Sequence, residues 1–355
     1  MPYACNKSNL NGLNGMEVLP EHLCIQHMFS DQTTTLKFSE GKIPFYLGGE
    51  VFETYYKFFG PDIDASILSI AQGPLVVLHG SGMSHDYLTT LADLAPSTTV
   101  IFYDQLGSGQ SSRLLWKDSS FWTIDLFIAQ LENLLYFFGI SHCFNLLGHC
   151  WGGVLASEFI ARRHPKGLQS LVLSNTLASS KLRNELLAAQ RLKLPERVQA
   201  MLKKHEAAGT TKSEEYRNAM RVFWAKHGCR VQPFPPEFIY TQCVSEDPED
   251  PRVLEAMNGN MRLDSEWDMT QTVISSIRHV PTLLITADLT ESASAPFFWG
   301  IDRMKCVQFP TPSHTPQWGE RERYMAVVAE FLKQTGHERC VLKNFFVVVS
   351  MTYII

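Results

Sequence analysis

The sequence predicts an α/β protein built on a mostly parallel, doubly wound sheet, and three observations support this. A continuous apolar run, typical of a parallel strand buried on both faces, occupies residues 74–78, and further strand-like, largely apolar runs occupy residues 99–103, 143–147 and 168–173. Stretches with apolar residues at helical spacing separate them, as between Ile124 and Phe138. The run 143–147 passes through a glycine-containing turn into a helix-like run, 154–163. Strand and helix thus alternate in the βαβ rhythm of such a sheet.

The first part of the chain predicts the edge of that sheet. Residues 1–35 are polar and show no period, so we expect a loosely ordered leader. Between Thr35 and Phe59, short β-like runs alternate with turn signals such as Gly48 and Gly49. This pattern favours antiparallel strands at one edge.

The later part of the chain predicts an insertion and a return to the sheet. Charged and apolar residues mix at helical spacing from about residue 181, and proline-rich segments follow up to residue 276. Strand-like runs resume at 280–285 and 306–309, and a helix-like stretch covers 321–332. We therefore predict a core formed by residues 36–180 and 277–335, interrupted by a helical lid at residues 181–276. Residues 336–355 form an apolar C-terminal tail.

Composition excludes several classes of function. With 45% hydrophobic and 19% charged residues in a chain of 355, the protein is of ordinary globular type. The net charge of −5, without a basic block, argues against a nucleic-acid partner. The eight cysteines lack C-x-x-C pairs, so we expect no metal site and a reducing, cytoplasmic location. The tail is too short to span a bilayer, so we expect it to pack on the body, without stable membrane insertion. We also expect no cofactor and a small-molecule substrate.

The turn at residues 147–153 is the strongest functional signal. Gly148 and Gly152 stand two residues before and two after Cys150, between a predicted strand and a predicted helix. This is the nucleophile elbow of the α/β-hydrolase fold, where a tight turn exposes a nucleophilic side chain.

The usual centre of this motif is serine, and Cys150 leaves three interpretations open. It is an active nucleophile, whose thiol pKa we expect the adjoining helix N-terminus to lower. Alternatively, it is an inert small residue in an inactive hydrolase, or a serine-to-cysteine replacement made to trap an intermediate.

Four motifs together resemble the proline iminopeptidase group of α/β-hydrolases, especially its fungal-type members. They are His79-Gly80, the stretch 104–111, the elbow at 148–153, and Ser313-His314 before a final helix. The resemblance covers roughly residues 47–333. It implies the fold, the lid and a nucleophile-acid-histidine layout.

The sequence departs from the pattern of that family at four places. Cys150 stands where the family has its nucleophilic serine, and the oxyanion loop beginning at His79 is one residue shorter. The position of the family's catalytic acid matches Thr290, with Asp288 and Glu291 nearby but out of register. Arg262 aligns with the lid glutamate that binds the substrate's free amino group. An arginine there would repel an ammonium and attract a carboxylate or carbonyl oxygen, so we expect the protein not to be a true aminopeptidase.

These observations define the expected site. Cys150 is the candidate nucleophile and His314 the base, because the chain order nucleophile, acid, histidine is that of the fold. Asp288 is the expected acid and Glu291 its alternative; a third option is no acid, with Thr290 or a water orienting His314.

Further residues are expected to bind the substrate and the developing charge. Backbone N–H groups of Gly80, Ser81 and Trp151 would form the oxyanion hole. Arg262 and Trp267 are candidate substrate-binding residues. His149 is expected to be structural, and His79 to hold the oxyanion loop by hydrogen bonding.

The predicted function is acyl chemistry on an ester, thioester, lactone or amide through a Cys-His pair. By analogy, an altered member of the family suits specialised metabolism. Two rival hypotheses stay open: a noncovalent cyclase or isomerase that uses His314 as acid and base, and a ligand-binding protein with an inactive hydrolase site.

Overall fold

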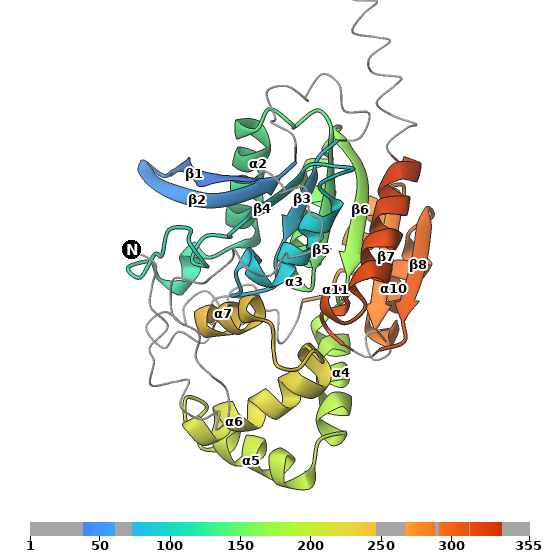
Figure 1. Cartoon of the computed structure of the whole chain (residues 1–355). Helices are drawn as coiled ribbons and strands as arrows, with labels where there is room; N and C mark the ends of the chain where they lie inside the picture. Colours follow the sequence, from blue (N-terminus) through green and yellow to red (C-terminus); the bar gives the residue numbers. More distant parts are fainter. Residues whose placement is uncertain (1–37, 61–72, 246–266, 288–290, 312, 336–355) are drawn as a thin grey trace, which may run out of the picture.

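A computed structural model describes residues 38–60, 73–245, 267–287, 291–311 and 313–335. In this part of the chain, one eight-stranded sheet has the order β1-β2-β4-β3-β5-β6-β7-β8 (Figure 1). Its strands are β1 (Phe38–Leu47), β2 (Glu50–Phe59), β3 (Leu75–Leu78), β4 (Val100–Tyr103), β5 (Phe144–His149), β6 (Leu168–Ser174), β7 (Thr282–Ala287) and β8 (Met304–Phe309). β1 and β2 run antiparallel to their neighbours, and the other pairs are parallel. The predicted parallel sheet with an antiparallel edge is confirmed.

The central strands β3, β4, β5 and β6 are buried at every position because both faces of the sheet are covered. In β3, Val76 and Leu78 belong to one hydrophobic cluster, whereas Leu75 and Val77 belong to the other. In β5, Leu146 and Leu147 divide between the clusters in the same way. Side chains alternate between the faces of a strand, so a continuous apolar run is the expected signature of a strand between two helical layers.

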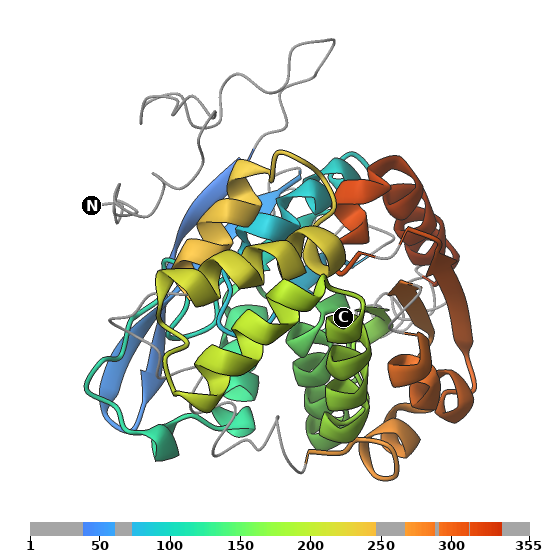
Figure 2. The same ribbon diagram turned by 90° about the horizontal axis from the view of Figure 1, so that it is seen from below.

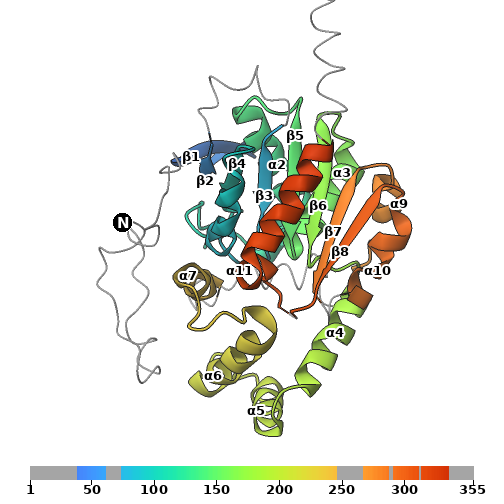
Figure 3. The ribbon, with the colours of Figure 1, turned by 45° about the vertical axis from the view of Figure 1, so that its right-hand side comes forward.

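Helices from different parts of the chain form these two layers. One layer contains α2 (Ile124–Phe137), α3 (Trp151–Arg163), α9 (Val273–Ile277) and α10 (Glu291–Gly300). The other contains the 3₁₀ helix η2 (His85–Leu94) and the helical residues 321–335. Figure 3 shows the helix 321–335, in red, crossing in front of the sheet. Two short elements, η3 (Ser119–Phe121) and α11 (Pro316–Gly319), lie in the connections.

The predicted insertion between β6 and β7 is helical. It contains α4 (Ser180–Leu192), α5 (Glu196–Ala207), α6 (Glu214–Phe223), the π-helical turn η4 (Trp224–Gly228) and α7 (Pro236–Ser245). These helices gather at one end of the sheet, and Figure 2 shows α4 to α6 lying across that end. They share a small cluster of their own around Leu202 and Phe223, and Trp224 packs against both this cluster and that of the η2 layer.

One element begins earlier than expected. The helix predicted at 154–163 begins at Trp151, directly after Cys150, because the nucleophile itself occupies the N-cap position of α3. The predicted leader, the C-terminal tail, Arg262, Asp288 and Thr290 lie outside the described residues.

Candidate active site

Cys150 occupies a strained turn that only small neighbours permit. Its backbone has φ 54° and ψ −118°, a conformation that non-glycine residues rarely adopt. A methyl group on Gly148 would collide with the backbone of α3, and one on Gly152 would collide with the Leu78 carbonyl group. The backbone N–H of Cys150 donates to the Ser174 carbonyl oxygen at 2.9 Å. The two glycines therefore let β3, β5 and α3 approach closely enough to present the thiol.

The electrostatic environment of the thiol differs from the expectation. Burial raises the pKa of Cys150 above its ordinary value, although a hydrogen bond from the Trp151 backbone N–H and the positive charge of Arg183 act in the opposite direction. The prediction of a lowered pKa at this helix N-terminus is therefore wrong, because desolvation disfavours the thiolate more than the helix and Arg183 stabilise it. At neutral pH the resting thiol is protonated.

The loop after β3 lies beside the thiol and is held by His79. A methyl group on Gly80 would lie 3.7 Å from the Cβ atom of Cys150. His79 donates from Nδ1 to the Gly80 carbonyl oxygen at 2.8 Å and accepts at Nε2 from the Gln105 backbone N–H at 2.9 Å. Burial lowers the pKa of His79, which keeps the ring neutral and suits this pair of bonds. His79 therefore holds the loop by hydrogen bonding, as expected.

Gln105 joins this loop to the elbow. Its side-chain amide donates to the His79 carbonyl oxygen at 2.9 Å and accepts from the indole N–H of Trp151 at 2.9 Å. All three side chains are buried. The backbone around the thiol is thus fixed by polar groups that are fully engaged with one another.

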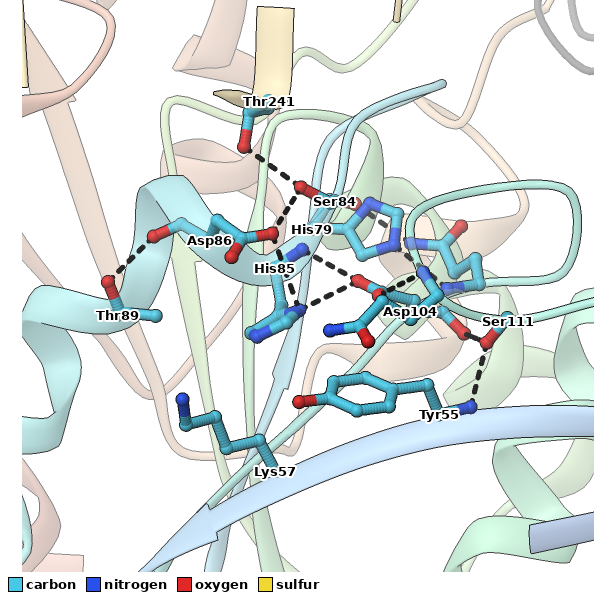
Figure 4. A network of polar contacts seen from close by, with 12 residues as sticks. Tyr55, Lys57, His79, Ser84, His85, Asp86, Thr89, Asp104, Ser111 and Thr241 are labelled. Atoms are coloured by element: carbon cyan, nitrogen blue, oxygen red, sulfur yellow. Dashed lines mark hydrogen bonds and ion pairs between the residues drawn. The ribbon is translucent and has the colours of Figure 1, made fainter. Parts of the chain in front are cut away.

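A buried ion pair anchors the chain just before Gln105 (Figure 4). One Asp104 carboxylate oxygen accepts from the backbone N–H of His85 at 2.8 Å and from its Nδ1 at 2.9 Å. Burial opposes the charge on each group, but the mutual attraction outweighs it, so the pKa of Asp104 is lowered and that of His85 is raised. A methyl group on Gly109, which has φ 52°, would collide with the carboxylate. The stretch 104–111 is therefore a structural turn wrapped around Asp104.

A hydroxyl pair connects the same region to the inserted helices. Ser84 donates to the Asp86 carboxylate at 2.6 Å, and its oxygen lies 3.0 Å from the hydroxyl of Thr241 on α7 (Figure 4). Ser84 and Thr241 are fully buried. The insertion is therefore attached to the core beside the oxyanion loop.

His314 follows β8 and lies against the elbow. Its ring centroid is 4.6 Å from that of His149, the residue before the nucleophile. Its carbonyl oxygen accepts from His149 Nε2 at 2.7 Å and from the Asn175 side-chain amide at 2.9 Å. Burial lowers the pKa of His314 to about 4, so the imidazole is neutral at neutral pH. The described residues show no hydrogen bond between the thiol of Cys150 and this imidazole.

The loop around His314 is also bonded to the inserted helices. The backbone N–H groups of His314 and Thr315 donate to the carbonyl oxygens of His227 at 2.8 Å and Gly228 at 3.1 Å. The Ser313 hydroxyl donates to the Gly228 carbonyl oxygen at 2.9 Å. His227 and Gly228 end the π-helical turn η4, so this turn contributes directly to the position of the candidate base.

The comparisons with known proteins agree on one family. The model of the alpha/beta hydrolase fold family matches residues 73–219. A proline iminopeptidase of Saccharolobus solfataricus is 31% identical over 297 residues, which cover 80% of this chain and 93% of the relative. The crystal structure of VinJ has a TM-score of 0.74 at 35% identity and covers 84% of this chain and 99% of its own. A proline iminopeptidase of Mycobacterium smegmatis has a TM-score of 0.71 at 32% identity, with coverage of 83% and 99%.

The chain belongs to the proline iminopeptidase-like family of α/β-hydrolases. It is therefore an enzyme of the α/β-hydrolase superfamily. Within the described ranges, none of its helices is long and apolar enough to cross a membrane. The same ranges contain no cluster of three or more histidine, cysteine or acidic residues suited to a metal ion.

Several predicted site residues of this α/β-hydrolase can be placed. Trp151 and the loop of Gly80 and Ser81 lie beside Cys150. The N–H of Gly80, a predicted oxyanion donor, donates to the hydroxyl of Tyr87 at 2.9 Å. Trp267 packs its partly buried side chain against the main hydrophobic cluster. Glu291 begins α10, but its side chain lies outside the description.

Three residues that shape the site of this hydrolase were not predicted from the sequence: Tyr87, Asn175 and Arg183. A polar residue directly after a buried strand was an available signal for Asn175, which follows β6 and has φ 47°. No comparable signal marks Tyr87, whose hydroxyl meets His149 across 62 positions of sequence.

Proposed function

We propose that the protein hydrolyses or transfers an acyl group through a covalent intermediate on Cys150, with His314 as the base. The observation that carries this proposal is the conformation of Cys150. A strained turn at the start of α3, with the Trp151 N–H directed at the sulfur and Gly80 alongside, is the geometry of a nucleophile elbow. An inert small residue would not need this strain.

The reaction begins from a neutral thiol and a neutral imidazole. Cys150 transfers its proton to His314 as the sulfur attacks the substrate carbonyl carbon, and the carbonyl electron pair moves onto oxygen. The N–H groups of Trp151 and Ser81 stabilise this oxyanion, since that of Gly80 is engaged by Tyr87. Collapse expels the leaving group, which takes the proton from His314. Water then gives a proton to His314 and attacks the thioester carbon; the C–S bond breaks, the carboxylic acid leaves, and the sulfur of Cys150 takes the proton back from His314.

The proposed acid lies next to the end of β7. Asp288 directly follows Ala287, whose backbone N–H donates to the Asn175 side chain at 3.0 Å. Asn175 in turn bonds the His314 carbonyl oxygen, so the end of β7 and the loop of the base share a partner. We retain Asp288 as the acid and Glu291 as the alternative.

The charge near the nucleophile favours substrates without a free ammonium group. Arg183, on the first turn of α4, is close enough for its positive charge to act on Cys150 and lower the pKa of the thiol, although burial outweighs this effect. The same positive charge would repel an α-ammonium group close to the scissile bond and attract an anionic or carbonyl-rich substituent. We therefore propose an ester, thioester, lactone or amide as substrate, in specialised metabolism, rather than a peptide with a free N-terminus.

One observation favours a second candidate function. The raised pKa of Cys150 and the lowered pKa of His314 describe a pair that is uncharged at rest. An uncharged pair also suits noncovalent binding of a ligand or acid-base catalysis by His314 alone.

A substrate panel tests the proposal. Aryl esters and thioesters with neutral, anionic and free-amino acyl groups are compared as substrates of the wild type and of Arg183→Gln and Cys150→Ala. We expect the free-amino substrates to have the lowest kcat/KM in the wild type. In Arg183→Gln, the difference in kcat/KM between these and the other substrates should become smaller. A wild type that prefers free-amino substrates contradicts the proposed substrate class. Full turnover by Cys150→Ala would favour the second candidate.

A further inference from the structure

Tyr87 connects the oxyanion loop to the elbow, although it belongs to neither. It lies on η2 and is fully buried. Its hydroxyl accepts from the backbone N–H of Gly80 at 2.9 Å and lies 2.7 Å from Nδ1 of His149. Its ring also packs edge-on against the His149 ring, with 5.2 Å between centroids. Gly80 of the oxyanion loop and His149 of the elbow thus share the hydroxyl oxygen of Tyr87 as a hydrogen-bond partner.

The directions of these hydrogen bonds follow from their partners. A carbonyl oxygen only accepts, so His149 Nε2 carries a proton and donates to the His314 carbonyl oxygen at 2.7 Å. Burial lowers the pKa of His149 well below its ordinary value, so the ring is neutral and its Nδ1 has no proton. Tyr87 must then donate its hydroxyl proton to Nδ1. The bonds run in one direction, from Gly80 through Tyr87 and His149 to the backbone of His314.

This arrangement connects three groups that the reaction needs in register. Gly80 precedes the proposed oxyanion donor Ser81 and lies against Cys150. His149 precedes Cys150, and the His314 carbonyl oxygen belongs to the proposed base. Without the hydroxyl, the Gly80 N–H and His149 Nδ1 would both lose their buried partner, and the loop would be free to move relative to the elbow.

We propose that Tyr87 is a positioning residue of the reaction, which keeps the oxyanion loop, the elbow and the loop of His314 in register through its hydroxyl group. This inference rests on the proposed function, because the effect on turnover requires acyl chemistry at Cys150. Its effect on His149 does not require any substrate, and the two can therefore be tested separately.

The kinetic test compares Tyr87→Phe with a matched control. Tyr103, on β4, is also fully buried, and its hydroxyl has no hydrogen-bond partner in the described part of the chain. We expect Tyr87→Phe to lower kcat about tenfold to a hundredfold with KM changed little, because small misplacements of catalytic groups cost this much. Tyr103→Phe should leave both constants within about twofold, on the scale of a minor change in local stability. An unchanged kcat in Tyr87→Phe, or an equal loss in both variants, overturns the proposal.

Nitrogen-15 NMR of the histidine rings gives the substrate-independent readout. In the wild type, His149 should show the neutral form protonated at Nε2, with the Nδ1 signal of a hydrogen-bonded acceptor; Tyr87→Phe should move that signal toward an unbonded nitrogen. A wild-type ring protonated at Nδ1 overturns the proposal even if Tyr87→Phe fails to fold. If no substrate yields turnover but the Nδ1 signal shifts as expected, the proposed acyl chemistry fails while the role of Tyr87 in holding the elbow stands.

Discussion

The proposed nucleophile, Cys150, and the proposed base, His314, are held by different sets of elements. Around Cys150, the hydrogen bonds of Gln105, His79 and Trp151 join segments that all belong to the sheet core. The loop of His314 shares its backbone hydrogen bonds between the core, through His149, and the inserted helices, through η4. These hydrogen bonds around the proposed nucleophile therefore come from the core, whereas those of the proposed base come from both the core and the insertion.

Because the proposed nucleophile and the proposed base have different hydrogen-bond partners, substitutions in the inserted helices can change the substrate pocket while Cys150 keeps its backbone conformation. Substitutions in α4 to α7 can alter the pocket and, through η4, the placement of His314. The backbone of the strained turn at Cys150 is held by hydrogen bonds within the core, as in the bond from Cys150 to Ser174, although the charge of Arg183 on α4 still acts on the thiol. We therefore expect changes on the base side to lower turnover while leaving the intrinsic reactivity of the thiol intact.

The replacement His314→Gln should give the largest effect: a large loss of kcat with little change in the alkylation rate of Cys150. Loss of a general base costs about 10²- to 10⁴-fold in kcat. The pKa of Cys150 is set by its burial, by Trp151 and by Arg183, so the rate at which iodoacetamide alkylates the thiol should stay within about twofold. If kcat and the alkylation rate of Cys150 fall by the same factor in His314→Gln, the reactivity of the thiol depends on His314.

A smaller effect is expected from Gly228→Ala in the inserted helices. A methyl group there would collide with the indole ring of Trp224 and shift the π-helical turn that bonds the His314 loop. We expect kcat to fall about tenfold, the scale of a modest displacement of a catalytic group.

Gly209→Ala is the matched control for that variant. Gly209 has φ 65°, so the change costs some stability, but nothing lies within 4 Å of the added methyl group. Its kcat should match the wild type when both are assayed well below the unfolding transition. If Gly228→Ala is as active as this control, η4 does not position the base.

The smallest effect concerns the thiol itself. Because burial raises the pKa of Cys150, alkylation should be slow at pH 7 and accelerate only above the ordinary thiol range, where the thiolate forms. Arg183→Gln removes a stabilising charge, so the alkylation midpoint should move further upward and the rate at pH 8 should fall about twofold to threefold. A midpoint well below the ordinary value of about 8.5 would contradict the role assigned to burial.

The features that could be predicted from the sequence are those that depend on residues close together in the chain. The run 143–147 is apolar because two helical layers cover it, and Gly148 and Gly152 are required by the tight turn, so both are visible without a structure. The placement of His314 followed from its position after the last strand. The helical character of the insertion followed from its apolar spacing.

The features that sequence missed depend on contacts between distant segments. Tyr87 and His149 are distant in sequence and meet only in the folded chain, in which η2 packs against β3 and β4. The pKa of Cys150 was predicted in the wrong direction because a helix N-terminus is visible in sequence, whereas the depth of burial is not. Arg183 carries no motif, and its influence arises because α4 begins soon after β6, beside the elbow.

Covalent catalysis by Cys150 is tested most directly by intact-protein mass spectrometry. The wild type and Cys150→Ala are exposed at near-neutral pH to activated esters and thioesters, and their masses are followed over time. We expect an acyl adduct in the wild type that maps to Cys150 and decays by hydrolysis, and no adduct in Cys150→Ala. Turnover by the wild type without any adduct at Cys150, together with full activity in Cys150→Ala, would contradict it.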